Sequence, residues 1–201
     1  MTQTITGNHA DIRIEPSLDL DTRYKHWVYR HPVAGAALAG VIATQMATIW
    51  GYYGKGIGLP SLPFPNYNGV LFAPASVAPD FHDFGNTGNF FVGQTVHFAN
   101  GVVFAIIFAL LAYKTLPAIG RKYTSIQKGI FFGTVQTIIS VGFLFPYVYA
   151  PKSGFGFFSF GANALGTNPD HWKLPFAVLV YHMVYGGFLG LLFDPCQPSD
   201  A

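Results

Sequence analysis

Long uncharged stretches separated by polar segments form the main pattern of this chain. The clearest is the stretch 90–113, which runs for 24 residues without a formal charge. An α-helix needs about 20 apolar residues to cross the hydrocarbon core of a bilayer. Three other stretches have a similar pattern, so the sequence predicts four membrane-spanning helices, at about 33–53, 90–113, 126–149 and 174–193.

The segments outside these helices differ in character. Residues 1–32 form a polar tail followed by mixed basic and aromatic residues typical of a membrane interface, and 194–201 form a short polar tail. The connections 54–89 and 150–173 are rich in Gly, Pro and aromatic residues, and 54–89 is too apolar for a solvated linker. We expect folded caps or a partner surface there. The predicted fold class is an all-α integral membrane protein, a four-transmembrane-helix bundle formed by residues 33–193.

Composition supports this prediction and narrows the function. Of the 201 residues, 51% are hydrophobic and 10% are charged, whereas soluble domains carry about 25% charged residues. The net charge of +2 is too small to indicate nucleic-acid binding. The one cysteine, Cys196, excludes an internal disulfide. The nucleotide-binding, hydrolase and zinc-protease motifs of soluble enzymes are absent.

The distribution of basic residues predicts the orientation. Eight flank one side of the predicted bundle and three flank the other: Arg13, Arg23, Lys25, Arg30, Lys114, Arg121, Lys122 and Lys128 against Lys55, Lys152 and Lys173. Basic residues are enriched on the cytoplasmic side of membrane proteins. We therefore expect both termini in the cytoplasm and the two aromatic caps outside, in the inner membrane of a bacterium.

Two of the predicted helices share a short motif. His97 and Gly101 in the second helix match His182 and Gly186 in the fourth, with three residues between His and Gly in each case. Both histidines lie about 10–12 Å below the outer boundary at 1.5 Å per helical residue. The match is either a duplication of one hairpin or a chance recurrence of two residues. A duplication would give two hairpins of equal orientation, which is a parallel repeat.

These two imidazoles allow two interpretations. At equal depth on alternate helices they could ligate a haem iron, with Gly101 and Gly186 leaving room for the macrocycle. Alternatively, both are core residues hydrogen-bonded to a polar layer, and the glycines serve only close helix packing. That layer would consist of the amides Gln45, Gln94, Asn100 and Gln136. A transport path lined by these amides is a third reading, although the spans lack the charges of a proton relay.

A second constellation lies in the caps. Asp80, His82 and Asp83 are close in the first cap, and Asp170 and His171 adjoin in the second. Carboxylates and imidazoles together can hold a divalent metal ion. The same residues are also ordinary loop residues, so a metal site formed by Asp80, His82, Asp83 and His171 is a hypothesis alongside that alternative.

We hypothesise that the chain is an accessory, non-catalytic subunit of a larger bacterial membrane complex of respiratory, photosynthetic or monooxygenase type. It would dock on other integral membrane subunits through its aromatic caps and polar N-terminal tail, because apolar exposed patches mark interaction surfaces. The alternative is a small b-type cytochrome-like protein with haem on His97 and His182. Expected non-protein partners are lipids or pigments at the bundle surface, besides a possible haem b.

Overall fold

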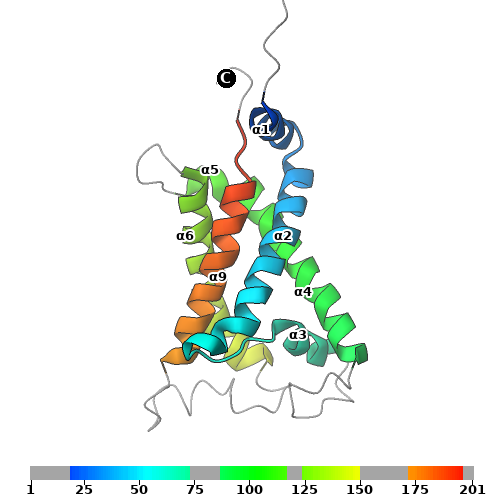
Figure 1. Cartoon of the computed structure of the whole chain (residues 1–201), viewed down its shortest axis with the longest axis vertical. Coiled ribbons are helices and arrows are strands. Elements are labelled where there is room, and N and C mark those ends of the chain that lie inside the picture. Colours follow the sequence, from blue (N-terminus) through cyan, green and yellow to red (C-terminus); the bar gives the residue numbers. More distant parts are fainter. Residues whose placement is uncertain (1–18, 73–86, 117–123, 150–171, 197–201) are drawn as a thin grey trace, which may run out of the picture.

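Helices are the regular elements of the computed structural model, which describes residues 19–72, 87–116, 124–149 and 172–196. Four long helices run side by side (Figure 1): α2 (Pro32–Tyr53), α4 (Thr87–Ile107), α6 (Thr124–Ile139) and α9 (Lys173–Leu192). The short helix α1 (Leu20–Arg30) lies at the end of the bundle where the chain leaves α9, and α3 (Phe64–Phe72) lies at the opposite end.

Among the residues that the structure describes, three helices are long and apolar enough to cross a membrane: Pro32–Ile57, Phe90–Thr115 and Lys173–Leu192. Their outward surfaces carry exposed large aliphatic side chains: Leu38, Ile42, Val103, Leu111 and Leu191. The face of α2 that packs against the other helices consists of fully buried alanines: Ala36, Ala39, Ala43 and Ala47. Small residues between helices and large apolar ones outside are typical of membrane proteins, because lipid solvates the large side chains and close backbone packing holds the helices together.

The third predicted span changes its helical form midway. It consists of α6, of 16 residues, and the π-helix η4 (Ser140–Tyr149), of 10 residues, which follows without a break. Pro146 lies in η4, and a proline ring clashes with the carbonyl four residues earlier in an α-helix. The chain nevertheless continues past Pro146 to Tyr149 in the wider helical form.

The second predicted span also contains a wider turn. After α4 the chain continues as the π-helix η3 (Phe108–Ala112) and then as the short helix α5 (Tyr113–Thr115). Phe108 is fully buried, with its ring 5.3 Å from that of Phe132 on α6. This aromatic contact brings the α1 end of α4 close to α6, and the two helices separate towards the α3 end (Figure 1).

The long helices pack in the order α4, α2, α9, α6, so that α2 contacts both α4 and α9. Contact between α6 and α9 is backbone to backbone. A Cβ atom added to Gly129 or Gly186 would overlap the carbonyl oxygen of the other glycine, and Gly133 and Gly190 are equally close to the facing backbone. This arrangement requires glycine, since any side chain would force the two helices apart.

Helix α1 ties the start of the described chain to its end. The Asp19 side chain accepts a hydrogen bond from the Thr22 amide and so caps α1, which lowers the pKa of that carboxyl. Tyr24 donates to the carbonyl of Leu192, and Lys25 lies 2.9 Å from Asp21 and 3.2 Å from Asp194. Residues 20–22, expected in an extended tail, therefore form the first turn of a helix that packs at the end of α9.

Part of the first cap is folded against the bundle. After the 3-10 helix η1 (Gly54–Ile57), the chain turns into α3, where Phe64 and Tyr67 are buried. Gly93 of α4 lets α3 approach closely, because a Cβ there would overlap the carbonyl of Pro65. Residues 73–86 of this cap, and residues 150–171 of the second cap, lie outside the described part of the chain.

Candidate functional site: a polar cavity between the helices

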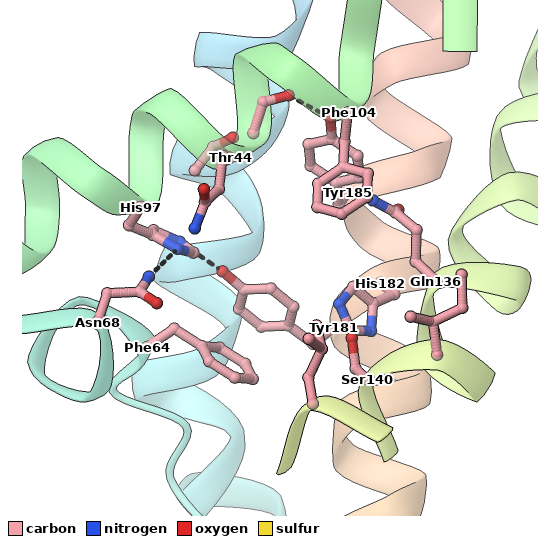
Figure 2. A pocket seen from close by; sticks show the side chains of 14 residues that line it. Thr44, Phe64, Asn68, His97, Phe104, Gln136, Ser140, Tyr181, His182 and Tyr185 are labelled. Atoms are coloured by element: carbon pink, nitrogen blue, oxygen red, sulfur yellow. Dashed lines mark hydrogen bonds between the residues drawn. The ribbon is translucent and has the colours of Figure 1, made fainter. Parts of the chain in front are cut away.

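A cavity of about 100 Å³ lies between α4 on one side and α6 with η4 on the other, with α9 and α3 completing its wall (Figure 2). Both motif histidines line it. Its lining is formed by polar, aromatic and aliphatic residues: Thr44, Phe64, Asn68, His97, Asn100, Gly101, Phe104, Gln136, Ile139, Ser140, Leu144, Tyr181, His182 and Tyr185. No Asp, Glu, Lys or Arg is among these lining residues, so the cavity is polar but uncharged.

His97 is buried and has protein partners at both ring nitrogens. Its Nδ1 lies 3.2 Å from the amide nitrogen of Asn68, which donates to it. Its Nε2 lies 3.0 Å from the Thr48 hydroxyl, whose own proton goes to a carbonyl of α2, and 2.8 Å from the Tyr181 hydroxyl. The proton of His97 is therefore on Nε2. Nδ1 accepts from the Asn68 amide, so it carries no proton, and the Thr48 oxygen can only accept a proton from Nε2.

His182 has the opposite arrangement. Its Nδ1 lies 3.2 Å from the hydroxyl of Thr137, which donates its own proton to the carbonyl of Gly133. The Thr137 oxygen therefore accepts from His182, and the proton of His182 is on Nδ1. Within the part of the chain that the structure describes, Nε2 of His182 forms no hydrogen bond. This nitrogen is left as a bare acceptor in a residue that lines the cavity.

Two tyrosines of α9 connect the halves of the bundle. Tyr181 reaches His97 of α4, and Tyr185 donates a hydrogen bond of 2.6 Å to the carbonyl of Gly101, also on α4. Both tyrosines are 4% exposed, so these hydroxyls are shielded from water and depend on their protein partners. The cavity lies next to the bond between Tyr181 and His97 and the bond between Tyr185 and Gly101.

Gln136 is the polar residue of the cavity whose hydrogen bonding is incomplete. Its side chain is 6% exposed, and its Oε1 atom is buried without a hydrogen-bond partner among the described residues. A buried amide oxygen without a partner is unfavourable by about 1–3 kcal/mol. Gln136 thus adds a second acceptor without a donor beside the cavity, and its oxygen is closed off from the cavity in this side-chain conformation.

The structure gathers some of the predicted polar layer and corrects one member. Gln136 is buried at the cavity, Asn100 lies at the cavity with an exposed side chain, and Gln94 is half-buried without lining it. Gln45 is exposed on the outer surface of α2, so it does not belong to a polar interior. The reason is the helix period: Gln45 lies two residues from Ala43, about 200° around the helix from the buried alanine stripe.

The residues present do not fit a haem held by two histidines. Both nitrogens of His97 are hydrogen-bonded within the protein, and the rings of Tyr181 and Phe64 lie between the two imidazoles (Figure 2). The Tyr181 ring centre is 6.3 Å from that of His97 and 5.6 Å from that of His182. A cavity of about 100 Å³ is also much too small for a haem macrocycle.

The motif glycines likewise serve helix packing. The Cβ position of Gly101 is occupied by the Thr44 hydroxyl, and that of Gly186 by the carbonyl of Gly129. Neither glycine therefore leaves space for a macrocycle, as the haem hypothesis required. Gly101 and Gly186 therefore fit the alternative interpretation, in which each glycine allows two helices to pack closely.

The predicted metal-site residues cannot be placed. Asp80, His82, Asp83 and His171 lie outside the described residues. Within the described ranges there is no group of three or more His, Cys, Asp or Glu residues close enough to hold a metal ion. The metal site therefore stays a prediction.

A second hollow lies on the outer surface of the helices. It is a shallow, mostly apolar groove of about 840 Å³ between α6 with η4 and the start of α9, bordered among others by Ile138, Val141, Phe176 and Leu179.

Comparison with family models, curated proteins and solved structures finds no match to this chain. The site is therefore interpreted from its own geometry.

Several residues of the site were not identified from the sequence. Asn68, Tyr181 and Thr48 hold His97, and Tyr185 and Ser140 complete the cavity. One signal was present: Tyr181 and Tyr185 lie four residues apart beside the His182 motif, and share one face of a helix. Asn68 had no such signal, because its contact depends on how α3 folds back onto α4.

Proposed function

We propose that the chain is an accessory subunit of a larger membrane assembly, and that the outward face of α2 docks on a transmembrane helix of a different subunit. The observation that carries this proposal is the exposed position of Gln45. Gln45 lies near the middle of the 26-residue span Pro32–Ile57, about 18–20 Å from either end at 1.5 Å per residue. An amide at that depth meets hydrocarbon unless another polypeptide covers it.

The neighbours of Gln45 form a continuous surface suited to a helix. Leu38, Val41, Ile42 and Ile49 are 38–46% exposed and lie on the same side of α2. The amide offers one acceptor and two donors. A matching helix therefore carries an amide or hydroxyl side chain at mid-depth, which would hydrogen-bond Gln45 while aliphatic side chains cover the rest.

A non-catalytic role agrees with the charges of the described spans. Their Lys residues, Lys55, Lys114, Lys128 and Lys173, lie near the ends of the segments that could cross the membrane. Asp, Glu, Lys and Arg side chains in the membrane interior usually mark transport or relay functions. The uncharged interior supports a structural contribution to the assembly.

We also infer four membrane crossings with both ends on one side. Tyr24 and Lys25 contact Leu192 and Asp194, so the chain starts and ends at the same end of the bundle, which an even number of crossings requires. This argument makes α6 with η4 the third crossing. Basic residues are more numerous at the α1 end, which supports placing that end in the cytoplasm of a bacterial inner membrane.

Matched contacts in the two hairpins support a duplication. A Cβ on Gly40 would meet Ala105 and the carbonyl of Gly101, and a Cβ on Gly129 would meet Gly190 and the carbonyl of Gly186. The histidine four residues before Gly101 or Gly186 contacts a threonine of the same neighbouring helix in each case. We infer that α2 with α4 and α6 with α9 are two copies of one hairpin.

The docking proposal is tested with a photo-crosslinking residue at position 45 in the source membrane. The expected result is a crosslink to a membrane-spanning segment of a different, stoichiometric subunit, and loss of that association in Gln45→Leu. The control position is Ile138, which is 68% exposed on α6, away from α2. Crosslinks from position 45 to lipid alone, or to a second copy of this chain, would contradict the proposal.

A further inference from the structure

The cavity between the histidines has a closed floor and an open rim. Thr44, Gln136, Tyr181 and Tyr185 on the floor are buried. On the rim, Asn100 is exposed and Phe104 half-buried on α4, while Ile139 is 47% exposed and Leu144 half-buried on α6 and η4. The cavity therefore opens between α4 and η4, the two walls that separate towards the α3 end of the bundle.

This opening lies at membrane depth. Asn100 and Phe104 are 10 and 14 residues into the span Phe90–Thr115, which corresponds to about 15–21 Å from its first end. A molecule entering between α4 and η4 would come from the hydrocarbon rather than from water. The cavity is thus accessible to a lipid-soluble molecule.

The lining determines the charge and polarity of an occupant. Since the lining contains no charged side chain, a bound ion would be unpaired in a medium of low dielectric constant, so the occupant is neutral. One acceptor faces the cavity without a donor, Nε2 of His182, whose proton is on Nδ1. Oε1 of Gln136 also has no partner among the described residues, but it is closed off from the cavity until the amide rotates. The occupant therefore carries a neutral hydrogen-bond donor, such as a hydroxyl group.

The size and walls of the cavity favour a ring. Phe64, Phe104, Tyr181 and Tyr185 supply aromatic surfaces. A closed apolar cavity of about 150 Å³ is known to hold benzene. A volume of about 100 Å³ with an open side is of the same order, and it accommodates a six-membered ring that extends partly into the opening.

We propose that this cavity binds a neutral, lipid-soluble phenol. Its hydroxyl donates to Nε2 of His182, or to Oε1 of Gln136 once that amide rotates, and its ring lies against the aromatic side chains drawn in Figure 2. Its apolar substituent leaves between α4 and η4. The site lies away from the outward face of α2, so Gln45→Leu is expected to bind the phenol normally even if that face has no partner.

The test compares two probes that differ by one methyl group on the full-length protein in phosphatidylcholine nanodiscs. One is 4-octylphenol and the other is 4-octylanisole, in which a methyl group replaces the donated proton. Binding measured by calorimetry against empty nanodiscs is expected to be saturable, with one site per chain, and about tenfold weaker for the anisole because one hydrogen bond is lost. Equal binding of both probes, or binding of neither because the cavity holds only water, would overturn the proposal.

Two variants locate the site. Gln136→Met keeps the side-chain length but removes the acceptor, and His182→Asn keeps a group near the Nδ1 position for Thr137 but removes the one at Nε2. Each is expected to weaken 4-octylphenol binding several-fold, while Gln94→Met, an amide outside the cavity, leaves binding unchanged. Because Oε1 of Gln136 has no partner to lose among the described residues, Gln136→Met is expected to keep the wild-type Tm. Unchanged 4-octylphenol binding in both cavity variants would refute the assignment of the phenol to this cavity. If neither variant folds, the proposal is decided by comparing 4-octylphenol with 4-octylanisole on the wild-type protein.

Discussion

The two hairpins of this bundle hold their histidines by the same contact but leave them in different states. Thr48 of α2 contacts His97 of α4 at 3.0 Å, and Thr137 of α6 contacts His182 of α9 at 3.2 Å. His97 gains two further partners, from α3 and α9. His182 has none of these additions among the described residues, and its Nε2 stays available. One imidazole therefore serves the fold, and the other can serve a ligand.

The hairpins also differ in how closely their backbones approach. Between α6 and α9, glycines of each helix lie against the backbone of the other helix. Between α2 and α4, the side chain of Thr44 fills the space at Gly101. A side chain can rotate to relieve an overlap, but a backbone carbonyl within a helix cannot. The second hairpin is therefore the less tolerant of any added volume.

The largest expected effect comes from adding a methyl group at this backbone contact. Gly186→Ala places a Cβ on the carbonyl of Gly129, and should lower the free energy of unfolding by about 3 kcal/mol, the upper part of the usual range for overpacking. Gly101→Ala should lower it by about 1 kcal/mol, because Thr44 can move. Unfolding in mixed detergent and SDS micelles measures both values.

The matched control for this pair is the adjacent Gly187→Ala. A Cβ there has Ile130 as its nearest neighbour at 3.8 Å, which is ordinary contact, so stability should not fall. If Gly187→Ala were as damaging as Gly186→Ala, helix propensity or insertion would explain the loss and the backbone contact would not.

The next effect separates the two histidines. His97→Ala leaves Asn68 and the Thr48 and Tyr181 hydroxyls without their common partner in a buried site, and should lower the unfolding free energy by about 2–3 kcal/mol. His182→Ala removes the bond to Thr137 and a bond to the backbone of Val178 on its own helix, but strands no group of α3 or of a tyrosine, and should lower it by about 1 kcal/mol. The same SDS titration ranks the two variants, and equal losses would remove the distinction drawn between the hairpins.

A smaller effect is expected at the bond that joins the hairpins. Tyr185→Phe removes the hydroxyl that donates to Gly101 but keeps the ring, so the unfolding free energy should fall by about 0.6 kcal/mol, the average for hydrogen bonds between membrane helices. Tyr147→Phe is the control, since Tyr147 is 69% exposed. A loss of the same size in the control would show that the measurement does not report the interhelical bond.

The smallest effect concerns the end of the bundle. Hydrogen bonds to Asp21 and Asp194 raise the pKa of Lys25. Its stabilisation is therefore fully present below the unfolded pKa of about 10.4, and is lost as the pH rises through the higher folded value. Because these groups are partly exposed, the effect should stay below about 1 kcal/mol. Lys25→Met should abolish this alkaline loss in stability profiles, and an unchanged profile would contradict the assignment.

The helices themselves were largely predictable from the sequence. The predicted ranges 33–53 and 174–193 correspond to Pro32–Tyr53 and Lys173–Leu192, because Pro32 and Pro175 lie at the first turns of these two helices. The buried face of α2 consists of alanines at three- and four-residue spacing, Ala36, Ala39, Ala43 and Ala47, a pattern visible in the sequence. Helix α1 was not predicted, since its amphipathic pattern is short and its fold depends on contacts with the far end of the chain.

The site was predictable only in part. The repeated motif identified His97 and His182, and both line one cavity. Gln45 and Gln136 were both expected in one polar layer. The threonine contacts align Thr48 with Thr137, so Gln136 corresponds to Ala47 and not to Gln45. Asn68 could not be assigned, because the docking of α3 on Gly93 is a long-range contact that local sequence does not encode.

The central claim is that the two imidazoles lie inside the bundle as opposite tautomers. It is tested most directly by nitrogen NMR of ¹⁵N-histidine-labelled protein in bicelles, with His97→Ala and His182→Asn used to assign the two rings. The account predicts a proton on Nε2 of His97 and on Nδ1 of His182, with Nε2 of His182 unprotonated. The same tautomer in both rings, or a proton on Nε2 of His182, would contradict it.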